Sequence, residues 1–260
     1  MDKTVFDEFL SYSCTKGVYY KNLTTGEVFA YNEDHPFSAA SVIKLGIMTE
    51  LFRRFEEGTL SPDELIEIKD EDRLPICGVA TFFHSGCTLT LKDLCWLMIT
   101  ISDNMASNLL IKRLGLENIE NTLKAMGFTG TVLRRRFFEN HPEKKHLVNT
   151  VTPAEIGRLY EMLYNRKLVS EKASETMLDM LAAQQCTNKY PLLLSWDVDL
   201  WHKTGEDNGI THDCGIVGAD EPFILCTFTN DVPHGKSGEV NLIMGKLVKA
   251  LTDQNRRAAR

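Results

Sequence analysis

The chain has 260 residues, of which 43% are hydrophobic, and its formal net charge is -7. This length and composition allow a substantial core, in one large domain or in two interleaved ones. The negative charge argues against non-specific binding to nucleic acid or to an anionic membrane. The sequence contains no apolar run of about 18 residues, which a membrane-spanning helix would need.

The seven cysteines are an odd number and include no C-x-x-C pair. Several lie inside apolar runs, where a reduced cysteine acts as a small hydrophobic residue. This usage predicts a reducing compartment. The first eight residues are partly acidic, whereas an export signal begins basic and then becomes apolar, so we expect a cytoplasmic protein. A processed start would look the same, and in that case the protein would be exported.

The first sixty residues predict a helix, a hairpin and a second helix. Apolar residues at helical spacing predict a short helix over residues 3–13. Residues 17–23 and 27–31 read as strands on either side of a turn at 24–26, which predicts a hairpin. Residues 37–52 are apolar almost all round, so the helix that they predict belongs in the interior of a domain.

Residues from about 60 to 190 are predominantly helical in pattern. Thr90-Leu-Lys-Asp93 resembles an N-cap with an acidic third residue, and it opens an apolar helix through Ile101. Thr152-Pro-Ala-Glu155 gives a similar start with proline in the first helical position, for a helix through about Tyr164. Further helices are predicted over 105–114, over 116–126 and from residue 170 onward.

The end of the chain returns to strands, which we expect over residues 198–204, 212–217 and 223–228, followed by a helix over about 240–250. The sequence therefore predicts an α/β (α+β) fold. Its five-stranded antiparallel sheet is flanked by N- and C-terminal helices and carries an inserted all-helical domain. We expect a sheet domain of residues 1–36 and 192–260, a helical domain of residues 37–191, and the active site in the cleft between them.

Lys44 is the one cation in the run of residues 37–52. A buried ammonium is costly unless it gains a hydrogen-bond partner or its pKa falls. Ser41 lies three residues earlier on the same helical face, so the pair combines a nucleophile with a base. We expect Ser41 in the first turn of the helix, where free backbone N–H groups and the helix dipole stabilise a developing anion.

Three short motifs occur in order: Ser41-Val-Ile-Lys44, Ser102-Asp-Asn104 and Lys203-Thr-Gly205. A serine three residues before a lysine should arise about once by chance in a chain of this length. Each tripeptide should arise on the order of 0.05 times, so the ordered set indicates one functional trio. The alternatives are that Ser102-Asp-Asn104 is only a capping turn and that Lys203-Thr-Gly205 is only a strand end.

With these motifs the chain resembles the serine penicillin-recognising enzymes, most closely class A beta-lactamases and beta-lactamase-related serine hydrolases. The resemblance covers essentially the whole chain. It implies that Ser41 is the acylated nucleophile and that Lys44 is one candidate for taking its proton. It also implies that Ser102 passes a proton to the leaving nitrogen. Asn104 would hydrogen-bond the substrate amide and Lys44.

The resemblance assigns the remaining groups to the strand that carries Lys203. Lys203 and Thr204 would hold a substrate carboxylate, and Gly205 would let the ligand approach the backbone. The backbone N–H groups of Ser41 and Glu206 would form an oxyanion hole. Donors of this kind are typically worth about 3 kcal/mol each in the transition state.

The chain departs from the class A pattern in one loop. Class A enzymes carry Glu-x-x-Leu-Asn there, and that glutamate activates the water that releases the acyl-enzyme. With Arg134 and Asn149 as the loop ends, Arg136 stands where the glutamate is expected, and Asn140 matches the motif's substrate-binding asparagine. Glu139 is the nearest carboxylate that could replace the missing base.

Two consequences follow from this loop and the strands near it. Losing a general base usually costs about 10² to 10⁴ in rate, so the acyl-enzyme would form and then hydrolyse slowly. The predicted strand over 223–228 also lacks an arginine of the kind that many class A enzymes use to hold the substrate carboxylate. Phe137 and Phe138, in the same loop, are more typical of a core than of substrate contacts.

The sequence therefore predicts a serine acyl hydrolase that opens beta-lactam amides through a Ser41 acyl-enzyme, acts on a small molecule and needs no cofactor. The alternative enzyme is a D-Ala-D-Ala-type peptidase or an esterase on the same scaffold. The alternative without turnover is a binding or sensor domain that a beta-lactam acylates once. The seven histidines show no zinc-ligand spacing, so we expect no metal site. We also expect a monomer that binds neither nucleic acid nor a membrane.

Overall fold

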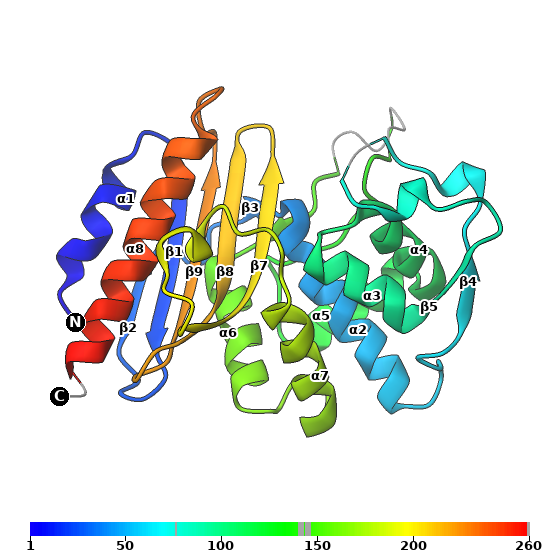
Figure 1. Cartoon of the computed structure of the whole chain (residues 1–260), viewed down its shortest axis with the longest axis horizontal. Coiled ribbons are helices and arrows are strands. Elements are labelled where there is room, and N and C mark those ends of the chain that lie inside the picture. The colour runs from blue at the N-terminus through cyan, green and yellow to red at the C-terminus, as the bar shows by residue number, and fades with distance from the viewer. Residues whose placement is uncertain (76, 140–142, 144–146, 259–260) are drawn as a thin grey trace.

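Five antiparallel strands from the two ends of the chain form one sheet (Figure 1). The structure, a computed structural model, describes residues 1–75, 77–139, 143 and 147–258. The strand order is β2-β1-β9-β8-β7, so β7 forms an edge of the sheet. The predicted fold class is confirmed. The strands are β1 (Thr15–Asn22), β2 (Val28–Tyr31), β7 (Asp199–Asp207), β8 (Ile210–Gly218) and β9 (Phe223–Asn230).

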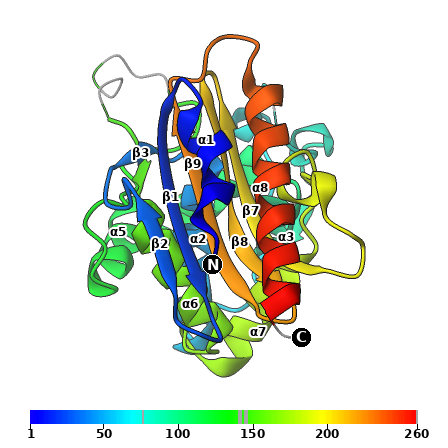
Figure 2. The ribbon, with the colours of Figure 1, turned by 90° about the vertical axis from the view of Figure 1, so that its left-hand side faces the viewer.

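Two terminal helices cover one face of the sheet. Figure 2 shows α1 (Asp7–Ser11) and α8 (Ser237–Ala258) on the same side of the strands. Their buried side chains, among them Phe9 and Met244, form a hydrophobic cluster with residues of β1, β8 and β9. The predicted first helix is shorter than expected because its start, Lys3–Phe6, is a 3₁₀ turn, whereas α8 is longer than predicted at both ends.

The other face of the sheet meets the helical part of the molecule, to the right in Figure 1. The central helix α2 is buried along residues 44–52, as the apolar pattern predicted. Its neighbours in the described chain include α3, α4, α5 and α7. The helices are α2 (Lys44–Glu56), α3 (Leu91–Thr100), α4 (Asn104–Leu114), α5 (Leu116–Ala125), α6 (Pro153–Tyr164) and α7 (Glu171–Ala182).

Short elements complete the helical part. Strand β3 (Phe37–Ser38) pairs with β6 (Thr150–Val151), and β4 (Leu65–Glu67) pairs with β5 (Thr88–Thr90). The 3₁₀ segment η2 (Ala40–Ile43) leads directly into α2. Ser41 therefore lies in a 3₁₀ turn just before the α-helix, rather than in the first α-helical turn that the pattern predicted.

Two predicted helix starts show the expected capping. The Thr90 hydroxyl accepts from the Asp93 N–H, and the Asp93 carboxylate accepts in return from the Thr90 N–H. At the start of α6, the Thr152 hydroxyl accepts from the Glu155 N–H, with proline in the first helical position. Such caps are worth about 1 kcal/mol each, because they satisfy donors that the first turn leaves free.

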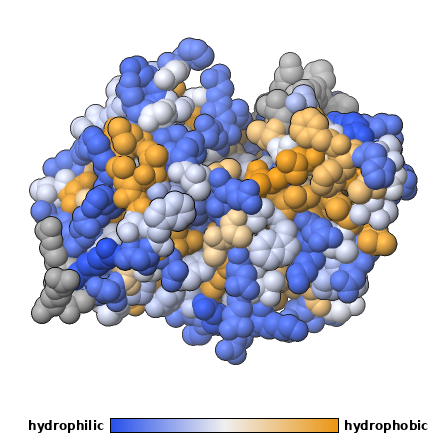
Figure 3. All heavy atoms as spheres, in the orientation of Figure 1, coloured by the Kyte–Doolittle hydropathy of each residue, from blue (hydrophilic) through white to orange (hydrophobic). Residues whose placement is uncertain are grey.

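All five strands of the sheet come from residues 1–36 and 192–260, and helices α2 to α7 come from residues 37–191. The division into two domains at these boundaries stays a prediction. Hydrophilic side chains cover much of the face drawn in Figure 3, and hydrophobic ones gather around α3 on its right-hand side. Among the described residues, no helix has the length and apolar content that a membrane crossing requires.

Candidate active site

Ser41 lines a cavity of about 430 Å³ between the edge strand β7, η2 and the loop after α5. The serine is partly exposed. Ala40, just before it, has φ of 42°, a left-handed conformation that costs a non-glycine residue on the order of 1 kcal/mol. Strain of this size persists only where the surrounding structure imposes it, so the backbone before Ser41 is held in a specific conformation.

The Lys44 side chain is completely buried and reaches the second motif. Its ammonium donates to the Ser102 carbonyl oxygen at 2.6 Å, to Ser102 Oγ at 3.1 Å and to Asn104 Oδ1 at 2.7 Å. Burial holds the pKa of Lys44 well below that of an ordinary lysine, and the nearby charge of Lys203 lowers it further. A lowered pKa favours the neutral amine, which is the form that can accept a proton.

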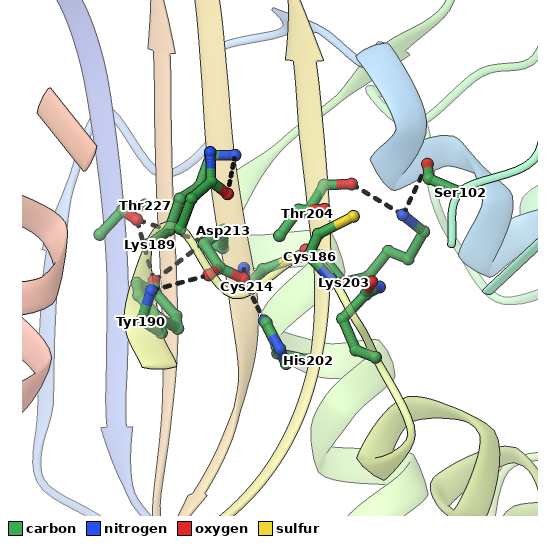
Figure 4. Close-up of polar contacts among 12 residues, drawn as sticks. Ser102, Cys186, Lys189, Tyr190, His202, Lys203, Thr204, Asp213, Cys214 and Thr227 are labelled. Carbon is green, nitrogen blue, oxygen red and sulfur yellow. Dashed lines mark hydrogen bonds and ion pairs between the residues drawn. The ribbon is translucent and has the colours of Figure 1, made fainter. Parts of the chain in front are cut away.

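Ser102 joins all three motifs, since its hydroxyl also accepts from Lys203 Nζ at 3.0 Å (Figure 4). Lys203 donates in addition to the Thr204 carbonyl oxygen at 2.9 Å. Burial lowers the pKa of Lys203 to about 8. Ser102 itself has φ of 58°, so it too is held in a left-handed conformation. One hydroxyl thus lies between two buried amines.

Asp103, the middle residue of the second motif, has a structural role that the sequence analysis did not assign. The buried Asp103 carboxylate accepts from the N–H groups of Ala106, Val79 and Ala80 at 2.7–2.9 Å. A Cβ on Gly78 would lie 2.1 Å from this carboxylate, so only glycine fits there. These contacts fix the segment that brings Cys77 to the wall of the cavity.

The end of β7 lies directly against η2. A Cβ on Gly205 would meet Val42 Cγ2 at 3.2 Å and Ala40 Cβ at 3.3 Å, so the glycine allows β7 and η2 to approach each other closely. Thr204 is buried, whereas Glu206 lines the cavity together with Ser41. The third motif therefore lies beside Ser41, and the close contacts at Gly205 are with protein atoms.

The loop expected to carry a deacylating base is closed at its neck by Asn149. Its Oδ1 accepts from the N–H groups of Arg134 at 2.8 Å and Arg135 at 3.0 Å. Inside the loop, the Phe137 ring lies against the active site, with Lys44 Nζ 4.7 Å from the ring centroid. The Phe137 ring therefore faces Lys44, and Arg136, which the register aligned with the glutamate, also lines the Ser41 cavity.

Glu139 follows Phe137 by two residues in the same loop. It lines a neighbouring cavity of about 250 Å³ with Asn108 and Lys112, and it is absent from the described lining of the Ser41 cavity. Its carboxylate accepts from the Arg136 N–H at 3.2 Å and lies 3.5 Å from the Arg136 guanidinium. Asn140, the other loop residue proposed to contact substrate, lies outside the described residues.

Two residues of this region carried no signal in the sequence analysis. Asn108 on α4 exchanges two hydrogen bonds of 2.9 Å with the backbone of Phe137, which fixes the ring over Lys44. Lys189 is fully buried and its ammonium lies 3.1 Å from the Glu206 carboxylate. Neither position belongs to a motif or a periodic pattern, so only the folded chain brings them to the site.

A model of the beta-lactamase enzyme family matches residues 2–254 of the chain. The chain belongs to this family. The beta-lactamase VEB-1 of Pseudomonas aeruginosa is 27% identical over 214 residues, which cover 77% of this chain and 72% of that protein. Family membership establishes a hydrolase of the serine beta-lactamase type.

Solved structures of beta-lactamase relatives share the fold. An ancestral class A beta-lactamase superposes with a TM-score of 0.87 at 22% identity, covering 96% of this chain and 99% of that one. A mutant of PBP-A, solved as an acyl-enzyme complex with penicillin-G, superposes with a TM-score of 0.83 at 22% identity and covers 96% of each chain. The fold is therefore that of class A beta-lactamases.

Proposed function

We propose that the protein opens the amide of a beta-lactam, a small molecule, through an acyl-enzyme on Ser41 and without a cofactor. Neutral Lys44 takes the proton from Ser41 Oγ as that oxygen attacks the carbonyl carbon. Ser102 delivers a proton to the ring nitrogen as the C–N bond breaks. The observation that carries the proposal is the Ser102 hydroxyl, which lies 3.1 Å from one buried amine and 3.0 Å from the other.

The other proposed contacts follow from the placement of the motifs. The N–H groups of Ser41 and Glu206 stabilise the oxyanion, because both residues line the same cavity. Asn104, which already accepts from Lys44, presents its amide to the substrate amide. Lys203 and Thr204 hold the substrate carboxylate. We propose that the protein acts as a monomer.

A panel of compounds tests the reaction class. We expect nitrocefin and benzylpenicillin to acylate the protein faster than D-Ala-D-Ala peptides or p-nitrophenyl esters, which the alternative peptidase and esterase would prefer. The rates are measured as product release under matched conditions. Faster release from the peptides or the esters would replace the beta-lactam assignment with the corresponding alternative.

A second candidate, a binding protein that stays acylated, is favoured by one contact. The apolar ring of Phe137 covers Lys44, where a base that activates water would have to lie. With nitrocefin we expect a burst of about one equivalent and then slow turnover, since a general base usually contributes about 10² to 10⁴ in rate. A linear time course without a burst would contradict slow deacylation.

Replacing Glu139 by glutamine tests the remaining candidate base. If Glu139 activates the deacylating water, we expect Glu139→Gln to slow steady turnover of nitrocefin and to leave the burst largely intact. Glu143→Gln, in the same loop, is the matched control. An unchanged steady rate would exclude Glu139 as the base and leave turnover to unassisted water.

The lowered pKa of Lys203 predicts a pH dependence. Its folded-state pKa of about 8 lies below that of a free lysine, so the ammonium is present below pH 8 and is lost as the pH rises through that value. We therefore expect the apparent affinity for benzylpenicillin, which carries a carboxylate, to fall above pH 8. In Lys203→Arg the cation persists, so the fall should disappear. An identical pH profile in both proteins would contradict this role.

A further inference from the structure

Lys189 is a buried cation whose charge is matched by a carboxylate on the wall of the Ser41 cavity. Its side chain is 0% exposed, and its Nζ lies 3.1 Å from Glu206 Oε2. In the described part of the chain, Glu206 is the one carboxylate within ion-pair distance of it. The Glu206 side chain is 54% exposed. An unpaired buried ammonium would be costly, so Lys189 holds the carboxylate in place.

The strand geometry puts this carboxylate beside the proposed carboxylate subsite. Side chains alternate along β7, so Thr204 and Glu206 share one face, and residues two apart on a strand lie about 7 Å from each other. The position between them, Gly205, faces η2. Lys203 points another way, toward Ser102, as Figure 4 shows. A substrate carboxylate bound at Thr204 would therefore have Glu206 as its neighbour.

We propose that Glu206, held by Lys189, is a specificity-determining residue that disfavours substrates with a free carboxylate beside the scissile amide. This inference rests on the proposed function. The Glu206 carboxylate repels a substrate carboxylate. It also pairs with Lys189, so the charge of that lysine is already matched and is not available to the substrate. Strands β8 and β9 contain no lysine or arginine that could compensate. Lys203 and Thr204 therefore hold a substrate carboxylate more weakly than they would if position 206 were neutral.

The test compares benzylpenicillin with its neutral methyl ester, which differ only in this charge. The second-order rate constant for acylation is measured for both compounds with the unmodified protein and with Glu206→Gln. We expect Glu206→Gln to raise the acylation rate with benzylpenicillin on the order of tenfold. The substitution removes the repulsion between two carboxylates about 7 Å apart, which is appreciable even in a polar medium. The rate with the ester should change by a much smaller factor, because the substitution keeps the backbone N–H of position 206 that the oxyanion contact uses.

Two further variants separate this effect from others. Asp199→Asn removes a carboxylate from the far, exposed end of β7 and should leave both rates unchanged. The double variant Lys189→Met with Glu206→Gln removes both charges, so it leaves no lone ammonium in the interior. We expect it to fold and to show a higher ratio of the benzylpenicillin rate to the ester rate than the unmodified protein.

The proposal would be overturned if, in Glu206→Gln and in the double variant, the acylation rate constants of the two compounds changed by the same factor or did not change. Intact mass distinguishes this result from failure of the proposed function. If both compounds add mass to the protein and the ratio of their rates is unaltered, the role proposed for Glu206 is wrong, whereas the proposed acyl-enzyme is retained. If neither compound adds mass, the proposed function is wrong, and so is the role proposed for Glu206.

Discussion

Replacing Lys44 by methionine is expected to slow acylation by benzylpenicillin about 10²- to 10⁴-fold, the usual contribution of a general base. Lys44 is buried among Ser102, Asn104 and the Phe137 ring, and burial lowers its pKa. Lys44 is the base that we propose for Ser41. The second-order rate constant of acylation, followed by intact mass, measures the effect.

Lys44→Arg is the matched control, because a guanidinium keeps the positive charge and stays protonated at neutral pH. We expect it to lose as much activity as Lys44→Met. Thermal unfolding of both variants shows whether the fold survives the change at this buried position. Near-normal acylation by a folded Lys44→Arg protein would show that the proton goes to another group.

Replacing Phe137 by glutamate is expected to shorten the lifetime of the acyl-enzyme about 10²-fold or more. The ring now lies 4.7 Å from Lys44 Nζ, and Asn108 fixes the backbone of this residue, so a carboxylate placed here would approach the same region of the site. There it could activate water for attack on the ester. The decay of the penicillin adduct after removal of excess compound gives the rate.

Phe137→Gln is the control that separates the effect of a new base from the effect of losing the ring. Glutamine has nearly the same shape as glutamate but carries no charge. We expect its adduct to decay more slowly than that of Phe137→Glu. The glutamate should also slow acylation, because a nearby carboxylate raises the pKa of Lys44. Equal adduct lifetimes in the two variants would contradict a missing base as the cause of slow turnover.

The sequence predicted the sheet and the central helix because both depend on local pattern. Strands β1, β8 and β9 are alternating or apolar in sequence, and helix α2 is apolar almost all round. Such patterns predict burial, and these elements are largely buried. The caps at Thr90 and Thr152 identified two helix starts for the same reason. Three short motifs then met because these elements brought them to one edge of the sheet.

The loop was harder to predict because long-range contacts set its conformation. Asn149 closes the neck and Asn108 holds the backbone at Phe137, each through two hydrogen bonds to residues far away in the sequence. These contacts place the Phe137 ring over Lys44, which the sequence did not predict. Lys189 was missed because a single lysine outside any pattern reads as a surface residue.

The central claim is that Ser41 is the residue that becomes acylated. Intact mass after mixing with benzylpenicillin tests it most directly, on the native protein and on Ser41→Ala. We predict that the native protein gains the mass of one penicillin and that Ser41→Ala gains none. No added mass on the native protein, or the same addition on Ser41→Ala, would contradict the account.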